Sequence, residues 1–282
     1  MRTRLSTRHG RNAAGKTKGA VAATAAATLL TLAGCGGSGT TDAFSNLSPS
    51  GVVGRRITGA TATIGGRAVS SWATVDRNNV VTEVGVTLPL AVIENPPAQP
   101  GSGPLGAIAV LPFPAQAQSS TFLNHVEMHW NPSGHEPGRY ENIPHFDLHY
   151  YAVPESEVRA IAPGRDPAAP ATNQVPDGYL YPGQDALVPQ MGVHAVSKAE
   201  FAPGAPPFSA SMILGYYNGR MTFVEPMITQ ELLKSRKTIS LPIARPAVLG
   251  RATRYPTRFT GTYDARAGAY QLVLSDFVTA AQ

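Results

Sequence analysis

Two short runs of the chain alternate strictly between polar and apolar side chains. They are His125-Val126-Glu127-Met128-His129 and His145-Phe146-Asp147-Leu148-His149. Successive side chains of an extended strand point to opposite faces of a sheet, whereas a helical face repeats about every 3.6 residues. Both runs therefore predict β-strands with one polar and one apolar face. The turn sequence Asn131-Pro132-Ser133-Gly134 follows the first run, so we expect the two strands to pair as a long-looped hairpin.

Other segments rich in β-branched and aromatic residues predict further strands, joined in pairs by short turns. These pairs are Arg67–Val75 with Val80–Leu90, Ser209–Tyr217 with Met221–Glu225, and Thr257–Tyr263 with Ala269–Phe277. The segment Pro163–Pro189 carries six prolines and predicts a long loop. Only Met227–Lys237 predicts a helix, with Thr229 as its N-cap. We therefore expect an all-β fold, mainly an antiparallel β-sandwich or barrel, with one short helix near the C-terminal third.

The N-terminal residues predict an export signal. Basic residues precede the apolar segment Gly19–Ala33, which at 15 residues is shorter than a membrane span. The ending Leu32-Ala33-Gly34-Cys35 resembles the lipobox of bacterial lipoproteins, which implies lipidation of Cys35. Ordinary secretion with an unused thiol is the alternative. We expect a lipoprotein signal peptide at 1–34, a flexible tether at 35–48 and one β-rich domain at 49–282. The protein would be exported to the cell envelope and anchored to a membrane by its N-terminal lipid, on the periplasmic or cell-surface side.

The charge distribution argues against nucleic acid as a partner. The whole chain has a formal net charge of +5, but six of its 23 Lys and Arg residues precede Cys35 and none of its 18 acidic residues does. The remainder is close to neutral and lacks the basic patch that binds phosphates. Cys35 is also the single cysteine, which excludes an intramolecular disulfide and a thiolate metal site in the domain.

The polar residues of the two alternating runs favour a divalent-metal site. Imidazoles two residues apart on a strand share a face, and they can converge with a carboxylate on one ion. Our predicted ligands are His145, His149, His194 and Glu225. Nitrogen and oxygen donors without thiolate suit Zn, Fe, Mn or Cu(II), and the sequence does not choose among them. For Glu225, a salt bridge to Arg220 or a helix-capping role is an equally good interpretation.

The sequence leaves open whether such a site is catalytic. Candidate general bases are Asp147, His135 and Glu127, while His125 and His129 are more typical of supporting residues. A small-molecule substrate cannot be inferred, because the chain has no Gly-x-Ser-x-Gly, His-Glu-x-x-His or phosphate-binding glycine motif. Two other interpretations remain. The polar rows could form the solvated face of a sheet, or a structural module could form homo-oligomers with histidines and with Tyr150, Tyr151, Tyr216 and Tyr217 at its interface.

Four sequence blocks carry a resemblance to a known family. They are Trp130–Pro137, Pro144–Tyr150, Met191–His194 and Phe223–Thr229. At these blocks the chain resembles a family of exported bacterial proteins of unknown function, typified by a sigma-E-controlled protein from a thermophile. The resemblance implies a β-rich fold and homo-oligomers, and it brings no activity. It places His135, His145, Asp147, His149, His194 and Glu225 at family motif positions; one departure is Ala195, where the family pattern leads us to expect an aromatic residue.

Overall fold

Antiparallel strands dominate the part of the chain that the computed structural model describes, residues 54–98, 100–101 and 103–280. These residues lie within one compact unit, Ala43–Gln282. The predicted signal peptide and tether, together with Cys35, lie outside the described residues. Within the described residues, no helix combines the length and the apolar character required to cross a membrane.

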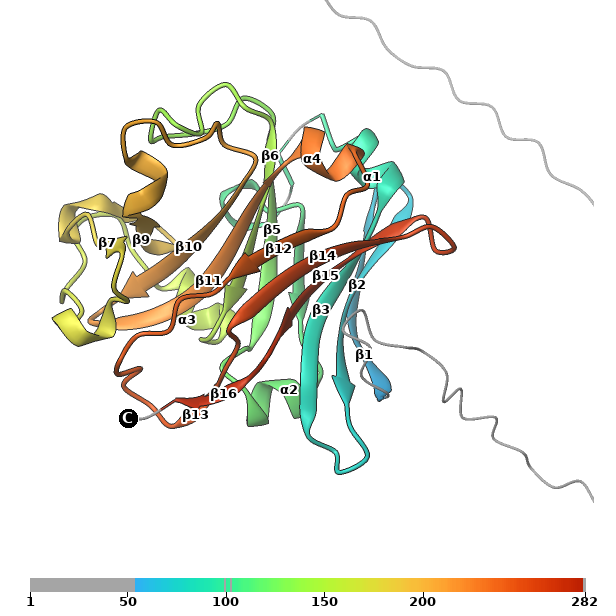
Figure 1. Ribbon diagram of the computed structural model, residues 1–282, viewed down its shortest axis with the longest axis horizontal. Helices are drawn as coiled ribbons and strands as arrows, with labels where there is room; N and C mark the ends of the chain where they lie inside the picture. The colour runs from blue at the N-terminus through green and yellow to red at the C-terminus, as the bar shows by residue number, and fades with distance from the viewer. Residues whose placement is uncertain (1–53, 99, 102, 281–282) are drawn as a thin grey trace, which may run out of the picture. The chain divides into compact units, whose positions relative to one another are not determined.

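The strands form two large sheets and one small one (Figure 1). The first sheet has six strands in the order β1 (Arg55–Ile64), β2 (Arg67–Val75), β3 (Val81–Pro89), β15 (Ala269–Ser275), β14 (Arg258–Asp264) and β12 (Ile239–Pro242). The second has the order β4 (Ala109–Pro112), β5 (His125–Asn131), β6 (His145–Tyr151), β11 (Arg220–Thr229), β10 (Ala210–Tyr217), β9 (Gly192–Ser197) and β7 (Tyr179–Leu180), and β8 (Leu187–Val188) also pairs with β9. The small sheet pairs β13 (Thr253–Tyr255) with β16 (Val278–Ala280). The predicted antiparallel β-fold is thus confirmed, with both large sheets open at their edges.

An apolar core fills the space between the two large sheets. Phe146, Leu148 and Tyr150 of β6 point into it and are fully buried, and so is Leu272 of β15 in the opposite sheet. The hydroxyl of Tyr150 donates a hydrogen bond across the core to the Leu272 carbonyl oxygen at 3.0 Å. The apolar half of the alternating pattern therefore faces the sheet partner, and the polar half faces away from it.

Short helices connect the strands. They are α1 (Leu90–Glu94), α2 (Ala115–Ser120), α3 (Glu155–Arg159) and α4 (Gln230–Lys234), with 3₁₀ turns at Pro104–Gly106, Thr172–Gln174, Gln184–Ala186 and Lys198–Phe201. The helix predicted at Met227–Lys237 is α4, but it is shorter because β11 continues to Thr229. Thr229 is its N-cap as expected, since its hydroxyl accepts a hydrogen bond from the Leu232 amide at 3.2 Å. The other three helices, each of six residues or fewer, were not predicted.

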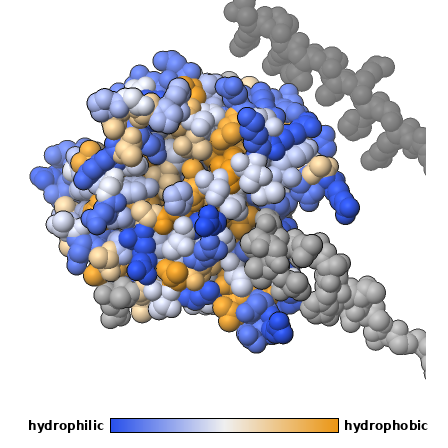
Figure 2. Space-filling model, in the orientation of Figure 1, coloured by the Kyte–Doolittle hydropathy of each residue, from blue (hydrophilic) through white to orange (hydrophobic). Residues whose placement is uncertain are grey.

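The predicted hairpins are present. The strands β2 and β3, β10 and β11, and β14 and β15 pair as expected, and β5 pairs with β6 across the long loop. The strands that were missed include β1, β9, β12, β13 and β16, and also β7 and β8, which lie in the segment predicted as a long loop. On the face of the molecule shown in Figure 2, apolar residues are interspersed with polar ones.

Candidate metal centre

The second sheet has a polar face that turns away from the main core. Strand pairing sets Glu127 of β5 opposite His149 of β6, and His129 opposite Asp147. On the other side of β6, β11 places Met227 opposite Asp147. Alternation along three neighbouring strands therefore gathers histidines and carboxylates on one surface, as the sequence predicted.

This polar face is buried rather than solvated. His125, Glu127, His149 and Glu225 are each only 1% exposed, and His145 is not exposed at all. A second apolar cluster covers the face, and it draws residues from the long β5–β6 loop, the α3 region and the segment before β10. Its members are Tyr140, Tyr151, Val153, Val158, Phe208, Ile213, Phe223 and Met227. The interpretation of this face as the wet side of a sheet is therefore wrong, and its polar groups need internal partners.

His149, His194 and Glu225 form the first compact group. One ligand atom from each lies within 4.8 Å of the others. His149 Nε2 is 3.4 Å from Glu225 Oε1, and His194 Nε2 is 3.7 Å from Glu225 Oε2. Within the described chain, neither ring nitrogen of His149 has a hydrogen-bond partner, and neither does Glu225 Oε2. Three strands thus bring two imidazoles and a carboxyl group together without a hydrogen bond of good geometry between them.

Neighbouring residues explain why these side chains meet. The ring of Phe223 packs edge-on against His149 at 5.0 Å and against His194 at 5.1 Å between ring centroids. A Cβ atom at Gly215, which lies opposite both Phe223 and His194, would overlap the Phe223 ring. The pairing of β11 with β6 runs through Phe223 and Val224 and resumes at Met227. The interruption includes Pro226, which has no N–H to donate to the ladder.

His135, His145 and Asp147 form the second compact group, whose ligand atoms also lie within 4.8 Å of one another. His135 Nε2 is 3.1 Å from Asp147 Oδ2, and His145 Nε2 is 3.3 Å from Asp147 Oδ1. His135 comes from the β5–β6 loop. Gly134 before it has a φ of +67° and leaves room for the Tyr140 carbonyl, which lets the loop fold back over the sheet.

The remaining polar residues of the face lie outside both groups. The carboxylate of Glu127 accepts a hydrogen bond from Arg159 at 2.8 Å and lies 3.3 Å from His125 Nε2. His125 stacks on Tyr151, with ring centroids 5.0 Å apart. The His129 ring meets the His149 ring edge-on at 5.0 Å. Glu127 is therefore held in an ion pair, whereas the acids of the two groups face only histidines or an amide.

Burial shifts the protonation of the first group toward its neutral forms. It lowers the pKa of His149 well below its ordinary value, an effect that the neighbouring histidines increase, and it lowers the pKa of His194 to about 4. Burial, and then the charge of Asp147, raises the pKa of Glu225 well above the ordinary value. In the absence of a bound cation, the two imidazoles are therefore neutral at neutral pH and present lone pairs, which are the form that binds metals.

In the second group, the pKa values of the two histidines are shifted in opposite directions. Burial lowers the pKa of His145 below its ordinary value. Burial also acts to lower the pKa of His135, but the hydrogen bond and the charge of Asp147 outweigh it, so the pKa is raised. His135 is the most exposed of the six residues, with 39% of its side chain accessible.

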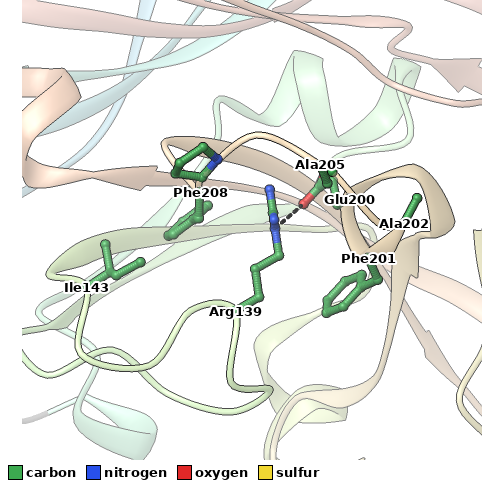
Figure 3. A pocket seen from close by; sticks show the side chains of 9 residues that line it. Arg139, Ile143, Glu200, Phe201, Ala202, Ala205 and Phe208 are labelled. Atoms are coloured by element: carbon green, nitrogen blue, oxygen red, sulfur yellow. Dashed lines mark ion pairs between the residues drawn. The ribbon is translucent and has the colours of Figure 1, made fainter.

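A pocket of about 410 Å³ lies beside the second group (Figure 3). Phe208 lines it and packs edge-on against the His145 ring at 5.3 Å, while Ile143, also in the lining, accepts a hydrogen bond from His145 through its carbonyl. Arg139 and Glu200 form an ion pair at 3.6 Å within the lining. The pocket therefore borders the wall that encloses His145.

The structure divides the predicted ligand set. His149, His194 and Glu225 lie together, whereas His145 lies in the second group with His135 and Asp147. The alternative partner of Glu225 is wrong, because Arg220 pairs with Glu157 instead. Ala195 is buried in the main core, so the residue at that position does not line the polar face. Three tyrosines considered for an oligomer interface, Tyr150, Tyr151 and Tyr216, are fully buried within the chain.

Fold and site together define a two-sheet antiparallel β-protein with two buried histidine–carboxylate groups on the outer face of one sheet. Comparison with known families adds one match: residues 76–130 are similar to the TTHB210-like family, described as "Hypothetical protein TTHB210". The matched segment runs from the β2–β3 turn to the end of the first polar row, and this fits the resemblance to an uncharacterised family. No curated protein and no solved structure matches the chain.

Proposed function

We propose that the protein binds a divalent transition-metal ion through His149, His194 and Glu225. The observation that carries this proposal is the convergence of one possible ligand atom from each residue within 4.8 Å of the others, together with His149 nitrogens and a Glu225 oxygen that have no hydrogen-bond partners among the described residues. Leaving such groups unsatisfied costs about 1–3 kcal/mol each. A bound cation would satisfy the Glu225 oxygen and one of the His149 nitrogens at once.

The donor set limits the identity of the ion. Two imidazoles and a carboxylate suit Zn, Fe(II), Mn or Cu(II), and they do not suit ions that prefer thiolates or oxygen-only cages. Three protein ligands are the number found in catalytic zinc sites, which keep a further position for water or substrate. Such an ion would act as a Lewis acid or activate water, and the partly exposed His194, at 24%, lies on its solvent side.

Burial of the histidines within one chain favours metal binding over an interface role, which requires them on the surface.

For the N-terminal residues, we propose export and membrane anchoring through a lipid on Cys35. That proposal is supported by the signal-like N-terminus alone. Assembly into homo-oligomers stays a proposal supported by the family resemblance.

Metal removal and return test the proposed function. We expect purified protein to lose thermal stability in chelator and to regain it with Zn(II), because an ion that binds only the folded state stabilises it. At a free-ion concentration of 100 times Kd, the gain is about 2.7 kcal/mol, or about 5–11 °C for a domain of this size.

The double variant His149→Ala/His194→Ala should lose the part of the response to Zn(II) that comes from this group. A matched control is His125→Ala, because His125 is equally buried on the same face but lies outside both groups. An unchanged melting temperature with and without Zn(II) in the native protein would rule the metal site out.

A further inference from the structure

We infer that a second divalent ion binds at His135, His145 and Asp147, so that the polar face holds two neighbouring ions. This inference rests on the proposed function, because it extends the same face from one ion to two. His145 and Asp147 are then ligands of the second ion, whereas the sequence analysis predicted His145 as a ligand of the same ion as His149 and His194.

The second group has the same signature of missing partners as the first. His145 is fully buried and Asp147 is 4% exposed. His145 Nε2 and Asp147 Oδ1 lack hydrogen-bond partners within the described part of the chain, although only 3.3 Å separates them. Buried atoms of this kind are expected to be satisfied, so the geometry calls for a species between them.

Backbone carbonyls fix which nitrogens are available. The Nδ1 atom of His145 donates to the Ile143 carbonyl at 2.6 Å, and the Nδ1 atom of His135 lies 2.7 Å from the Glu136 carbonyl. A carbonyl oxygen only accepts, so Nδ1 of each ring carries a proton, and the neutral His145 ring has its lone pair on Nε2. Both Nε2 atoms face the Asp147 side chain, and that of His135 is hydrogen-bonded to Oδ2 at 3.1 Å.

A cation bound among the three side chains would take the place of the proton on His135 Nε2 and would pair the unsatisfied atoms of His145 and Asp147. Metal-binding histidines typically donate their other N–H to a backbone carbonyl or carboxylate, which is the arrangement seen at both imidazoles here. Asn131 adds support from the neighbouring strand, because its amide donates to Asp147 Oδ2 at 2.6 Å and orients the carboxylate.

The two groups adjoin along β6. Asp147 and His149 are two residues apart on the same face, which places their Cα atoms about 6–7 Å apart. The charge of Asp147 also acts on both Glu225 and His194 of the first group. His135 comes from a loop and is 39% exposed, whereas Glu225 of the first group is almost fully buried, so we expect the second ion to exchange faster than the first.

Zinc stoichiometry tests the inference. Purified protein is stripped with chelator, saturated with Zn(II), desalted and analysed for bound zinc per chain. We expect two ions in the native protein, one in His135→Ala and in His145→Ala, and one in His149→Ala/Glu225→Gln. Loss of a direct ligand should weaken binding at least as much as loss of a supporting residue, which costs roughly 10–100-fold. His135→Ala keeps the test valid if His145→Ala fails to fold, because His135 is partly exposed; circular dichroism checks each variant, and His125→Ala is the control.

Different outcomes overturn different claims. One zinc in the native protein, unchanged in His135→Ala but lost in His149→Ala/Glu225→Gln, would refute the second ion and leave the proposed function standing. No bound zinc would refute both. A zinc content that none of these substitutions changes would mean adventitious surface binding and would also refute both.

Discussion

Replacing Glu225 by Gln should stabilise the metal-free protein while removing tight metal binding. The carboxyl group of Glu225 is 1% exposed and faces two imidazole nitrogens at 3.4 and 3.7 Å. Because its pKa is raised above the ordinary value of 4.5, Glu225 contributes stability at pH below 4.5 that is lost as the pH rises through the raised pKa. The metal-free protein should therefore carry this cost at neutral pH.

The magnitude follows from the missing hydrogen bonds. A Gln amide has no proton to lose, and its N–H groups can donate to the lone pairs of His149 or His194. Satisfying one buried polar group is worth about 1–3 kcal/mol. We therefore expect Glu225→Gln to raise the unfolding free energy of the metal-free protein by about 2 kcal/mol, or the melting temperature by about 4–8 °C.

Glu127→Gln is the matched control. Glu127 is also 1% exposed on the same face, but it accepts a charge-assisted hydrogen bond from Arg159 at 2.8 Å. The same substitution there should cost about 1–3 kcal/mol, because hydrogen bonds to charged groups are the stronger ones. Thermal and urea unfolding in chelator at neutral pH measures both variants. The reasoning is refuted if both substitutions shift stability in the same direction, or if Glu225→Gln still binds Zn(II) with native affinity.

Three further predictions concern the core, the protons and the N-terminus. Leu148→Ala should lower the unfolding free energy by about 2–5 kcal/mol without changing the metal content, because Leu148 is buried on the opposite face of β6 from the histidines. A changed metal content would contradict the placement of Leu148 and the histidines on opposite faces of the strand. Metal affinity should rise with pH, because Glu225 must lose its proton while His194, with a pKa of about 4, is already neutral. Calorimetry in buffers of different ionisation heat should detect the released proton. Metal binding that does not depend on pH would contradict the loss of a proton from Glu225. Cys35→Ser should move the protein from the membrane to the soluble fraction of the cell envelope, and continued membrane retention would exclude the lipid anchor.

Alternation and turn chemistry were sufficient to predict much of the sheet structure. The rows beginning at His125 and His145 form paired strands with their histidines on one face, because a period of two leaves little freedom once the apolar face is buried. The turn at Asn218-Gly219 likewise fixes the β10–β11 hairpin. The strand predicted at Met221–Glu225 is β11, which continues through Pro226 to Thr229. Packing on both faces of the sheet outweighed the single lost ladder bond.

The burial of the polar face could not be predicted from the strands. It depends on Tyr140 in the β5–β6 loop, Val158 in α3 and Phe208 before β10, which come from segments with no regular apolar pattern. The division into two groups depends on the loop as well, because it brings His135 to Asp147 and His145. Loop paths of this length follow from tertiary packing and not from local sequence.

The position of Glu225 depends on long-range register. The sequence marks it as an acid at the end of an apolar strand, and the structure buries it on the polar face. Which histidines it meets is decided by the antiparallel pairing of β11 with β6 and β10, and by β9 beyond them. The pairing of β11 with β6 joins residues more than 70 positions apart, and no local pattern encodes it.

Anomalous diffraction at the zinc absorption edge, from crystals of the zinc-saturated protein, tests the central claim most directly. We expect a strong anomalous difference peak about 2.0–2.2 Å from the Nε2 atoms of His149 and His194 and from a carboxylate oxygen of Glu225. Peaks confined to the surface, or the absence of a peak among these three side chains, would contradict it.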